Sequence, residues 1–189
     1  MLDLGNMREI YLPLDADGAK SLRAGDCVLA TGTLFSARDA AHQRFCETLR
    51  EGGKLPVDLK GQTVFYLGPS PAAPGRCIGA CGPTSSYRMD AYTPLLLREG
   101  MRAMIGKGKR SSEVIRTMKE CGAVYFGAVG GAAAYLSTCV ESCECAAYED
   151  LGTEAVWRLR VCRMPLIVLI DSEGNNLYVS GPEEARGME

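Results

Sequence analysis

Segments of strand length alternate with segments of helical pattern along nearly the whole chain, and this alternation restricts the fold most. Runs rich in β-branched and aromatic residues recur between stretches whose apolar residues lie three or four positions apart. We expect strands at residues 8–12, 26–35, 63–67, 102–105, 123–129, 144–147, 166–171 and 176–180. We expect helices from 36 to the glycine pair 52–53, at 94–99, at 112–121 and, after the glycine pair 130–131, at 132–136. The pattern predicts a mixed α/β domain.

Two helix ends and one turn carry local signals. Ser36 and Asp39 have the Ser-x-x-Asp spacing of an N-terminal capping pair. Gly122 follows the helix at 112–121 and suits a left-handed C-terminal cap. Residues 171–174 (DSEG) have the composition of a turn, which we expect to join the last two strands.

The size and charge of the chain exclude several classes of protein. Its 189 residues suffice for one domain, which we expect over residues 1–180, with a polar tail over 181–189. The net charge of −2 provides no basic surface for nucleic acid or an anionic membrane. No apolar run approaches the roughly 18 residues of a membrane span, and the N-terminus lacks the pattern of a signal peptide. We therefore expect a cytoplasmic protein.

Nine cysteines are a high and odd number for such a chain. Cys77 lies near Cys81, and Cys139, Cys143 and Cys145 form a second group, but neither group has the Cys-x2-Cys spacing of a zinc site. Converging thiolates from these groups could hold an iron–sulfur cluster. Alternatively, the cysteines are small buried hydrophobes, with Cys143 and Cys145 on one face of a strand. The single histidine excludes a histidine-rich metal site.

Residues 68–86 form the longest segment without a strand or helix pattern. The segment holds four prolines and four glycines and almost no bulky apolar residue. A loop of this length inside a compact domain is uncommon, and such loops are usually functional.

Three strand-to-loop junctions combine cations and hydroxyls with glycines, and the first is at 36–42. Arg38 lies in the first turn of the expected helix, where a cation opposes the helix dipole unless it binds an anion together with the helix amides. It could equally be a surface arginine that pairs with Asp39 or Glu47. His42 lies one turn later on the same face, where it could orient the site or be an ordinary helix histidine.

The other two junctions lie at 82–90 and 105–110. In the second, three consecutive hydroxyls at 84–86 can cap the following helix or donate to a bound oxyanion, and Arg88 lies one turn on. In the third, glycines on both sides of Lys107 would let this lysine approach a ligand closely. An ordinary N-terminal cap and a solvated basic turn are the alternatives.

Together the junctions offer Arg38, Arg88 and Lys107 as separated cations with hydroxyl donors nearby. This set suits a small dianion with two carboxylates, because guanidinium groups bind carboxylates in bidentate geometry. Phosphate is the competing ligand, but the chain has neither a Walker loop nor a GxGxxG after a strand. Spacing alone does not show that the three cations converge.

Five segments, taken in order, resemble a known family. They are ARDAAH at 37–42, GPTSSYRMD at 82–90, KGKRS at 107–111, GAVYFGAVGGAAA at 122–134 and YEDLGTEAVW at 148–157. The sequence resembles the beta subunit, or C-terminal domain, of the class I iron–sulfur hydro-lyases. This family comprises class I fumarate hydratase and L(+)-tartrate dehydratase, and the resemblance covers about residues 5–180.

The resemblance implies a swivelling β/β/α domain with a mixed sheet or barrel-like core flanked by helices. It implies that residues 1–180 are a beta-type catalytic domain that works with an alpha subunit. The alpha subunit of the family holds a 4Fe-4S cluster through three cysteines of its own, so we expect no metal in this chain. An αβ pair doubled by two-fold symmetry, or a homodimeric contact, is the expected assembly.

The family's site residues can be carried over one by one. Its ARDAAH arginine corresponds to Arg38, its hydroxyl pair to Thr84 and Ser85, its next arginine to Arg88 and its KG lysine to Lys107. The resemblance implies that Arg38, Arg88, Thr84 and Lys107 bind substrate, and that Ser85, Thr84 and Lys107 take part in catalysis. The second hydroxyl is a suspected base in this family, and serine replaces the usual threonine at this position.

The implied reaction is the reversible removal of water from a 2-hydroxy dicarboxylate, either malate to fumarate or L-tartrate to oxaloacetate. The alternative is a stand-alone domain that binds dicarboxylates, or regulates, without catalysis. A third possibility is an independent protein with a cysteine-bound metal. Glu149 and Asp150 resemble acidic residues of the family without an assigned role, and we expect Trp157 in the core or at an interface.

Overall fold

The computed structural model describes residues 7–128 and 133–186, and it contains one mixed sheet. The strands are β1 (Arg8–Leu12), β2 (Cys27–Ser36), β3 (Thr63–Phe65), β4 (Ala103–Gly106), β5 (Val124–Gly127), β6 (Val140–Ala147) and β7 (Val156–Ile170). Their order in space is β1-β2-β3-β4-β5-β7-β6. β1 to β5 run parallel to one another, whereas β7 runs antiparallel to both β5 and β6.

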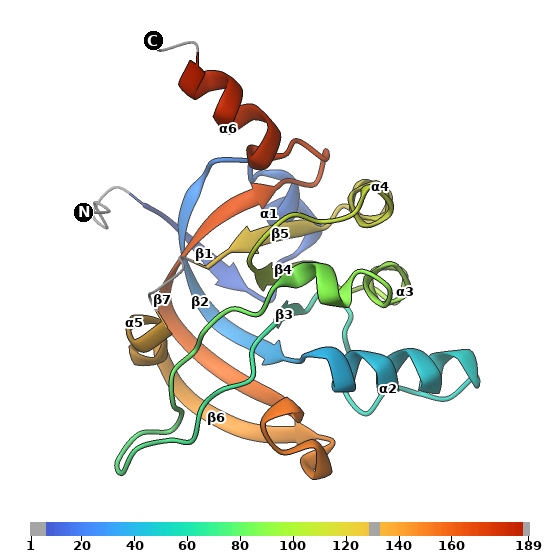
Figure 1. Cartoon of the computed structure of the whole chain (residues 1–189), viewed down its shortest axis with the longest axis vertical. Helices are drawn as coiled ribbons and strands as arrows, with labels where there is room; N and C mark the ends of the chain where they lie inside the picture. The colour runs from blue at the N-terminus through green and yellow to red at the C-terminus, as the bar shows by residue number, and fades with distance from the viewer. Residues whose placement is uncertain (1–6, 129–132, 187–189) are drawn as a thin grey trace.

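The sheet closes on itself because β7 pairs with β2 as well. The antiparallel register of these two strands runs from Cys27 opposite Ile167 to Ser36 opposite Trp157. β2, β3, β4, β5 and β7 therefore form a five-stranded barrel, and β1 and β6 extend it as edge strands (Figure 1). The expectation of an α/β fold with a mixed, barrel-like sheet and flanking helices is confirmed.

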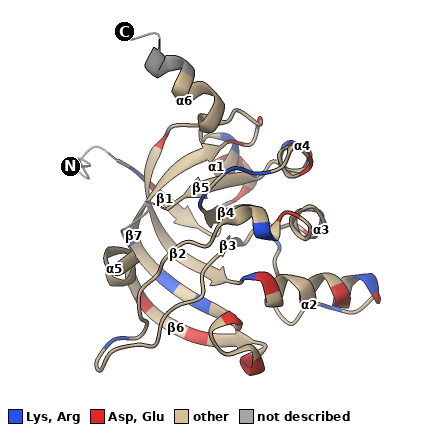
Figure 2. Cartoon of the chain, in the orientation of Figure 1, with Lys and Arg blue, Asp and Glu red and all other residues tan. Residues whose placement is uncertain are grey.

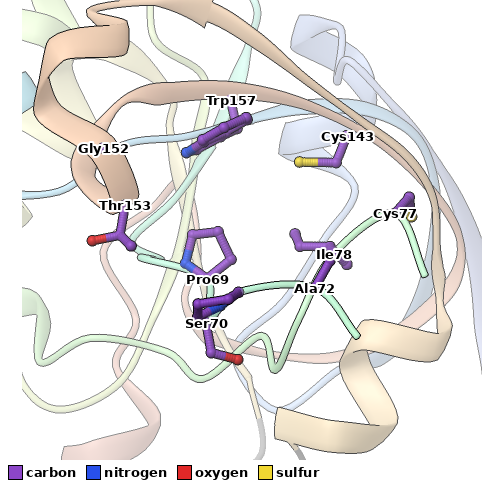
Figure 3. A pocket seen from close by; sticks show the side chains of 10 residues that line it. Pro69, Ser70, Ala72, Cys77, Ile78, Cys143, Gly152, Thr153 and Trp157 are labelled. Atoms are coloured by element: carbon purple, nitrogen blue, oxygen red, sulfur yellow. The ribbon is translucent and has the colours of Figure 1, made fainter. Parts of the chain in front are cut away.

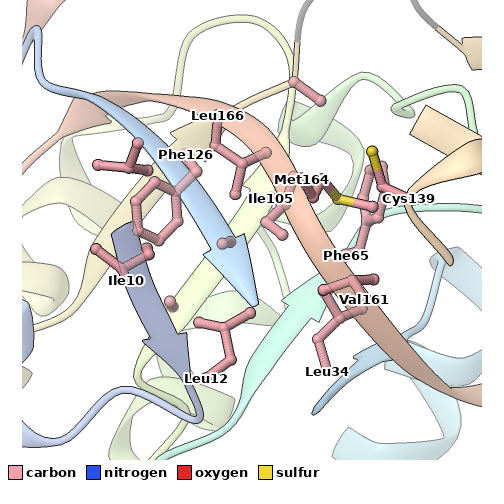
Figure 4. Close-up of a cluster of buried hydrophobic side chains, with 14 of the residues drawn as sticks. Ile10, Leu12, Leu34, Phe65, Ile105, Phe126, Cys139, Val161, Met164 and Leu166 are labelled. Atoms are coloured by element: carbon pink, nitrogen blue, oxygen red, sulfur yellow. The ribbon is translucent and has the colours of Figure 1, made fainter. Parts of the chain in front are cut away.

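Two apolar clusters form the core, one inside the barrel and one outside it. Alternate residues of the parallel strands contribute to each cluster, because successive side chains of a strand point to opposite faces. Phe65, Ile105 and Phe126 belong to the inner cluster, which Figure 4 shows from close by. Their neighbours Val64 and Met104 belong to the outer cluster. Burial on both faces explains why these strands read as continuous apolar runs.

Helices cover the outer face of the barrel on one side. The helices are α1 (Ala16–Lys20), α2 (Asp39–Arg50), α3 (Thr93–Arg98), α4 (Ser112–Cys121), α5 (Ala133–Thr138) and α6 (Leu177–Arg186), with the 3-10 turns η2 (Ser86–Met89) and η3 (Glu149–Glu154). α2, α3 and α4 lie next to one another (Figure 1) and supply Phe45, Leu96 and Met118 to the outer cluster. As expected, α4 ends at Gly122 in the left-handed conformation, with φ 65°.

The expected strand at 176–180 is wrong, because α6 begins at Leu177 and Asn176 forms only an isolated bridge with Ile170. The Asn176 side chain accepts from the N–H of Tyr178 at 3.0 Å, and its carbonyl accepts from Val179 and Ser180. This Asn cap starts a helix although the residues after it are good β-formers. α6 also takes in residues 181–186, which the sequence analysis places in a polar tail.

Two strands are longer than their patterns indicate. β6 begins at Val140 rather than at 144, and β7 begins at Val156 rather than at 166. Charged residues interrupt the apolar alternation in both segments, and these charges pair across the two strands. Arg160 Nε lies 3.1 Å from Glu141 Oε2, and Figure 2 shows basic residues of β7 beside acidic residues of β6.

A few expectations fall on residues that the structure does not describe. Outside the described residues lie the end of the strand expected at 123–129, the glycine pair 130–131 and the first residue of the helix at 132–136.

Among the described residues, no helix is both long enough and apolar enough to cross a membrane.

Candidate active site

The five residues expected at the site lie along one edge of the barrel, where β2, β3 and β4 end. Arg38 follows β2 by two residues, and Lys107 directly follows β4. Thr84 returns from the long loop to this edge, where its N–H donates to the carbonyl of Tyr66 at 2.7 Å. Ser85 and Arg88 follow it in the same segment. The carboxyl ends of neighbouring parallel strands are the edge at which α/β sheets bind their ligands.

Ser85 and Lys107 are paired through their backbones. The two residues form a parallel β-bridge, and the N–H of Ser86 donates to the carbonyl of Lys107 at 2.9 Å. Paired strands lie about 5 Å apart, so both side chains start from adjacent positions. The Lys107 side chain is exposed and makes no ion pair with a described residue. Its ammonium group therefore projects into solvent from a backbone position next to that of Ser85.

Ser86 anchors this segment to the barrel. It is buried, its Oγ accepts from the N–H of Lys107 at 3.1 Å, and the Tyr125 hydroxyl lies 2.9 Å from the same oxygen. Gly106 allows the approach, because a Cβ at this glycine would lie 2.0 Å from Ser86 Oγ. The hydroxyls of Thr84 and Ser85, by contrast, make no hydrogen bond within the described residues, so both can bind a ligand.

Asp39 links the two arginines of the site. Its Oδ1 accepts from Arg88 Nε at 2.8 Å, and its Oδ2 lies 3.7 Å from Arg38 Nη2. Glu154 places Oε1 3.4 Å from the same nitrogen of Arg38. The Arg38 side chain is 21% exposed and the Arg88 side chain 43%. Both guanidinium groups are thus held by internal carboxylates and still reach the surface.

The expected capping pair of Ser36 and Asp39 is wrong. Ser36 is the last residue of β2, paired with β3 and β7, and its buried hydroxyl has no partner among the described residues. α2 begins after Arg38, which is extended and gives no side-chain cap. Glu154 Oε2 accepts from the N–H of Ala40 instead, at 3.1 Å. Strand pairing on both sides of Ser36 outweighs the local capping signal.

Sequence reasoning misses Arg110, whose side chain is fully buried beneath the site. Its Nε donates to Asp90 Oδ1 at 2.7 Å, and its Nη2 donates to Thr93 Oγ1 at 2.8 Å. Its guanidinium lies over the rings of Tyr66 and Tyr125, 5.3 and 5.1 Å from their centroids. Such stacking stabilises a desolvated arginine.

Arg110 and Asp90 together fix Lys107 relative to Arg88. The other oxygen of Asp90 accepts from the N–H of Ser111 at 2.7 Å, so the carboxylate binds the segment after Lys107 at two points. Asp90 itself ends the 3-10 turn that carries Arg88. In the sequence, Arg110 stands in a basic, glycine-rich stretch that reads as a solvated turn, and nothing there indicates burial.

His42 supports the backbone of Arg38. Both the backbone N–H of His42 and its Nδ1 bind the carbonyl of Arg38, at 2.8 and 2.9 Å. Because a carbonyl only accepts, Nδ1 carries the proton. Complete burial lowers the pKa of His42 to about 4, so the ring is neutral near pH 7. Both interpretations of this histidine therefore apply in part, since it is a buried helix residue that also holds Arg38.

The acidic segment around 149–154 packs against α2. Asp150 binds Arg44 through both oxygens, with Oδ1 2.8 Å from Nη1. Glu149 is exposed. Trp157 packs against the inner cluster, as expected for a core residue.

A cavity of about 340 Å³ lies beside the site, between the long loop and the strands β6 and β7 (Figure 3). Its wall includes Pro69, Ala72, Ile78, Cys143 and Trp157. None of the predicted site residues lines it, and its wall is mostly apolar. The cavity therefore does not suit a dicarboxylate, and the ionic cluster remains the candidate site.

Two of the nine cysteines are strongly affected by burial. Burial raises the pKa of Cys81 to about 12 and that of Cys143 to about 11, so both are neutral thiols in the metal-free chain. No three His, Cys, Asp or Glu side chains in the described part of the chain converge in a metal-binding arrangement. All nine cysteines are unpaired.

Two arginines, a lysine and two hydroxyls without partners among the described residues thus lie at the carboxyl edge of the barrel, the edge at which α/β sheets bind their ligands. Comparison with known proteins names the family. Residues 6–181 match the family described as "Fumarase C-terminus". The chain belongs to this family.

The chain is similar to proteins with two kinds of name. The chain is 39% identical to "Fumarate hydratase 1, mitochondrial" of Leishmania major and 37% identical to "Fumarate hydratase class I, anaerobic" of Escherichia coli, in each case over 150 residues, 78% of this chain. It spans 27% of the length of either relative. It is 35% identical to a Methanocaldococcus jannaschii protein named "Putative L(+)-tartrate dehydratase subunit beta", over 91% of both chains. The expected resemblance is confirmed.

Proposed function

We propose that this chain is the beta subunit of a hydro-lyase that removes water reversibly from a 2-hydroxy dicarboxylate. The pairing of Ser85 with Lys107 beside the cluster of Arg38, Asp39 and Arg88 carries this proposal. It combines two arginines that can bind carboxylates with a hydroxyl residue whose backbone pairs with that of a lysine, and this lysine makes no ion pair with a described residue. The match over 91% of the protein named "Putative L(+)-tartrate dehydratase subunit beta" supports the assignment as a separate subunit.

In this proposal Arg38 and Arg88 bind the two carboxylates and hold the substrate in one orientation. Ser85 acts in its deprotonated form, which takes the proton from the carbon next to a carboxylate and becomes the neutral hydroxyl. Serine is a weak base, and the Lys107 ammonium beside it stabilises the deprotonated form. Negative charge develops on the substrate carboxylate as this proton leaves, and Arg88 and Lys107 stabilise it. Thr84 donates a hydrogen bond to the bound substrate.

The iron–sulfur cluster of the reaction belongs, in our proposal, to an alpha subunit rather than to this chain. Its open iron would supply a Lewis acid for the departing hydroxyl group. The name "subunit beta" of the Methanocaldococcus jannaschii relative supports the presence of a partner subunit. We place the assembly, an αβ pair doubled by two-fold symmetry, in the cytoplasm, where unpaired cysteines and an oxygen-sensitive cluster are stable.

The test is to co-express this chain with a cluster-bearing alpha subunit, purify the complex without oxygen and assay fumarate hydration and L-tartrate dehydration. We expect activity that requires both chains and is lost in Arg38→Ala and Arg88→Ala complexes that still assemble. Assembly with an intact cluster but without turnover of either substrate would contradict the proposal. That result would favour a domain that only binds dicarboxylates.

A further inference from the structure

Glu154 caps the N-terminus of α2, although it lies far from this helix in the sequence. α2 begins after Arg38, whose side chain cannot cap the free amides of the first turn. Glu154 Oε2, 114 residues away in the sequence, accepts from the N–H of Ala40 at 3.1 Å. A carboxylate at this end of a helix is also favoured by the helix dipole.

The second oxygen of Glu154 acts on the side chain of Arg38. Oε1 lies 3.4 Å from Arg38 Nη2, so one carboxylate binds both the first turn of α2 and the guanidinium that projects from its start. Because both oxygens are used, the carboxylate has little freedom to rotate. The orientation of the Arg38 guanidinium is thereby tied to that of the α2 backbone.

The Arg38 guanidinium also lies against the backbone at Gly68. A Cβ on Gly68 would lie 2.8 Å from Arg38 Nη1 and 3.3 Å from the carbonyl of Thr153. Gly68 thus leaves no room for a larger residue between Arg38 and the end of η3. Arg38 has only 21% of its side chain exposed, which is low for a surface arginine.

By charge alone, a glutamate here weakens the binding of an anion. A substrate carboxylate that reaches Arg38 meets the negative charge of Glu154 nearby, within the range at which charges interact at a protein surface. The Glu154 carboxylate nevertheless lies within ion-pair distance of the Arg38 guanidinium. This arrangement favours orientation of the arginine over maximal affinity for the anion.

We propose that Glu154 is a positioning residue that orients Arg38 for the substrate carboxylate, so that η3 is part of the active site. This inference rests on the proposed function and names a residue that acts through Arg38 without touching substrate. Misplacement of an orienting group by about 1 Å can cost about 100-fold in rate. Replacing Glu154 by a neutral residue also removes a charge that repels the substrate, and this offsets the loss of substrate affinity. The loss is therefore expected in kcat rather than in KM.

The kinetic test uses the assembled two-chain enzyme with Glu154→Gln, which keeps an oxygen for the Ala40 amide and removes the charge. We expect kcat to fall at least about tenfold while KM changes less than about threefold. The matched control is Asp150→Asn, which breaks the other ion pair between η3 and α2, a pair that includes none of the predicted site residues. It is expected to leave both constants unchanged.

A double-mutant cycle separates orientation from general stability. If Glu154 acts through Arg38, Glu154→Gln causes no further loss of kcat/KM in the Arg38→Ala background. An equal loss in both backgrounds, an unchanged kcat in Glu154→Gln, or the same loss in Asp150→Asn would overturn the inference. Unchanged kcat/KM in Arg38→Ala would instead contradict the proposed function.

A measurement that does not depend on turnover tests the same inference even if the Arg38→Ala enzyme is inactive. NMR relaxation of the Arg38 Nε–H group in the full chain reports how firmly the guanidinium is held. We expect a clear fall in its order parameter in Glu154→Gln and none in Asp150→Asn. An equally ordered Arg38 in Glu154→Gln would overturn the inference whatever the kinetics.

Discussion

Ser85 and Lys107 lie opposite each other in a parallel β-bridge at the end of β4, although they belong to separate segments of the chain. The backbone of Ser85 thereby lies next to that of Lys107. Ser86 fixes the bridge, because it binds both the carbonyl and the N–H of Lys107 and its hydroxyl accepts from Tyr125. The two residues that carry the hydroxyl and the ammonium group thus start from adjacent backbone positions.

The first prediction concerns this pair. Ser85→Ala removes the proposed base, and kcat of the assembled enzyme should fall by about 100-fold or more, the range typical of a lost general base. Ser85→Thr keeps the hydroxyl and should retain most of the activity. Steady-state kinetics at saturating substrate measures both. A Ser85→Ala enzyme with unchanged kcat would show that another group removes the proton.

The second prediction uses Gly68, the residue that lies against Arg38. The Cβ in Gly68→Ala would displace the guanidinium, because the tip of a side chain moves more easily than the backbone. Because Arg38 is displaced while the Glu154 charge remains, KM should rise several-fold and kcat should fall, whereas the midpoint of thermal unfolding should stay nearly constant. Gly181→Ala is the control, since its Cβ would make only an ordinary contact, 3.6 Å from Leu177. Equal KM values in Gly68→Ala and wild type would contradict the role given to Arg38.

The third prediction concerns the buried Arg110. Arg110→Met fills a similar volume but leaves Asp90 without its cation, and breaking a buried ion pair costs about 3–5 kcal/mol of unfolding free energy. Denaturation by urea measures this loss. Arg116→Met is the control, because this arginine is 68% exposed and lies 3.9 Å from Glu120. A loss below about 1 kcal/mol for Arg110→Met would show that Arg110 is not fixed as described.

The fourth prediction is a pH dependence of stability. Burial lowers the pKa of His42 from 6.5 to about 4, so below pH 6.5 the unfolded chain takes up a proton that the folded chain does not. His42 therefore reduces the unfolding free energy as pH falls, by about 2 kcal/mol between pH 6.5 and 5. Its contribution is constant above about pH 7.

The control for this prediction is His42→Asn, which can still donate to the Arg38 carbonyl but does not titrate. Urea denaturation at a series of pH values should give a flatter curve for His42→Asn than for wild type between pH 5 and 6.5. Parallel curves for the two proteins would mean that His42 is protonated in the folded state at these pH values.

The elements with strong apolar patterns could be predicted from sequence, and those set by distant contacts could not. The strands that end at Ser36 and Phe65 are apolar on both faces, and α4 has its glycine cap, so local sequence identifies them. At Asn176 a side-chain cap overrides residues that favour a strand. β7 extends back to Val156 only because β2 and β6 pair with it.

The residues of the candidate site could also be predicted only in part from the sequence. Arg38, Arg88 and Lys107 could be named because cations beside glycines and hydroxyls are visible along the chain. Their supports, Glu154 and Arg110, come from segments that resemble a surface acidic stretch and a solvated turn. Only the fold brings these charges against the site, so no local pattern distinguishes them from ordinary surface residues.

The most direct test of the account is a titration of a fixed amount of cluster-bearing alpha subunit with this chain, without oxygen, while fumarate consumption is followed. We predict no turnover by either chain alone and a linear rise that saturates at one copy of this chain per alpha subunit. Arg88→Ala should bind to the same stoichiometry without restoring turnover. Full activity of the alpha subunit alone, or a saturated complex that consumes no hydroxy-dicarboxylate or fumarate, would contradict the claim that this chain completes the active site.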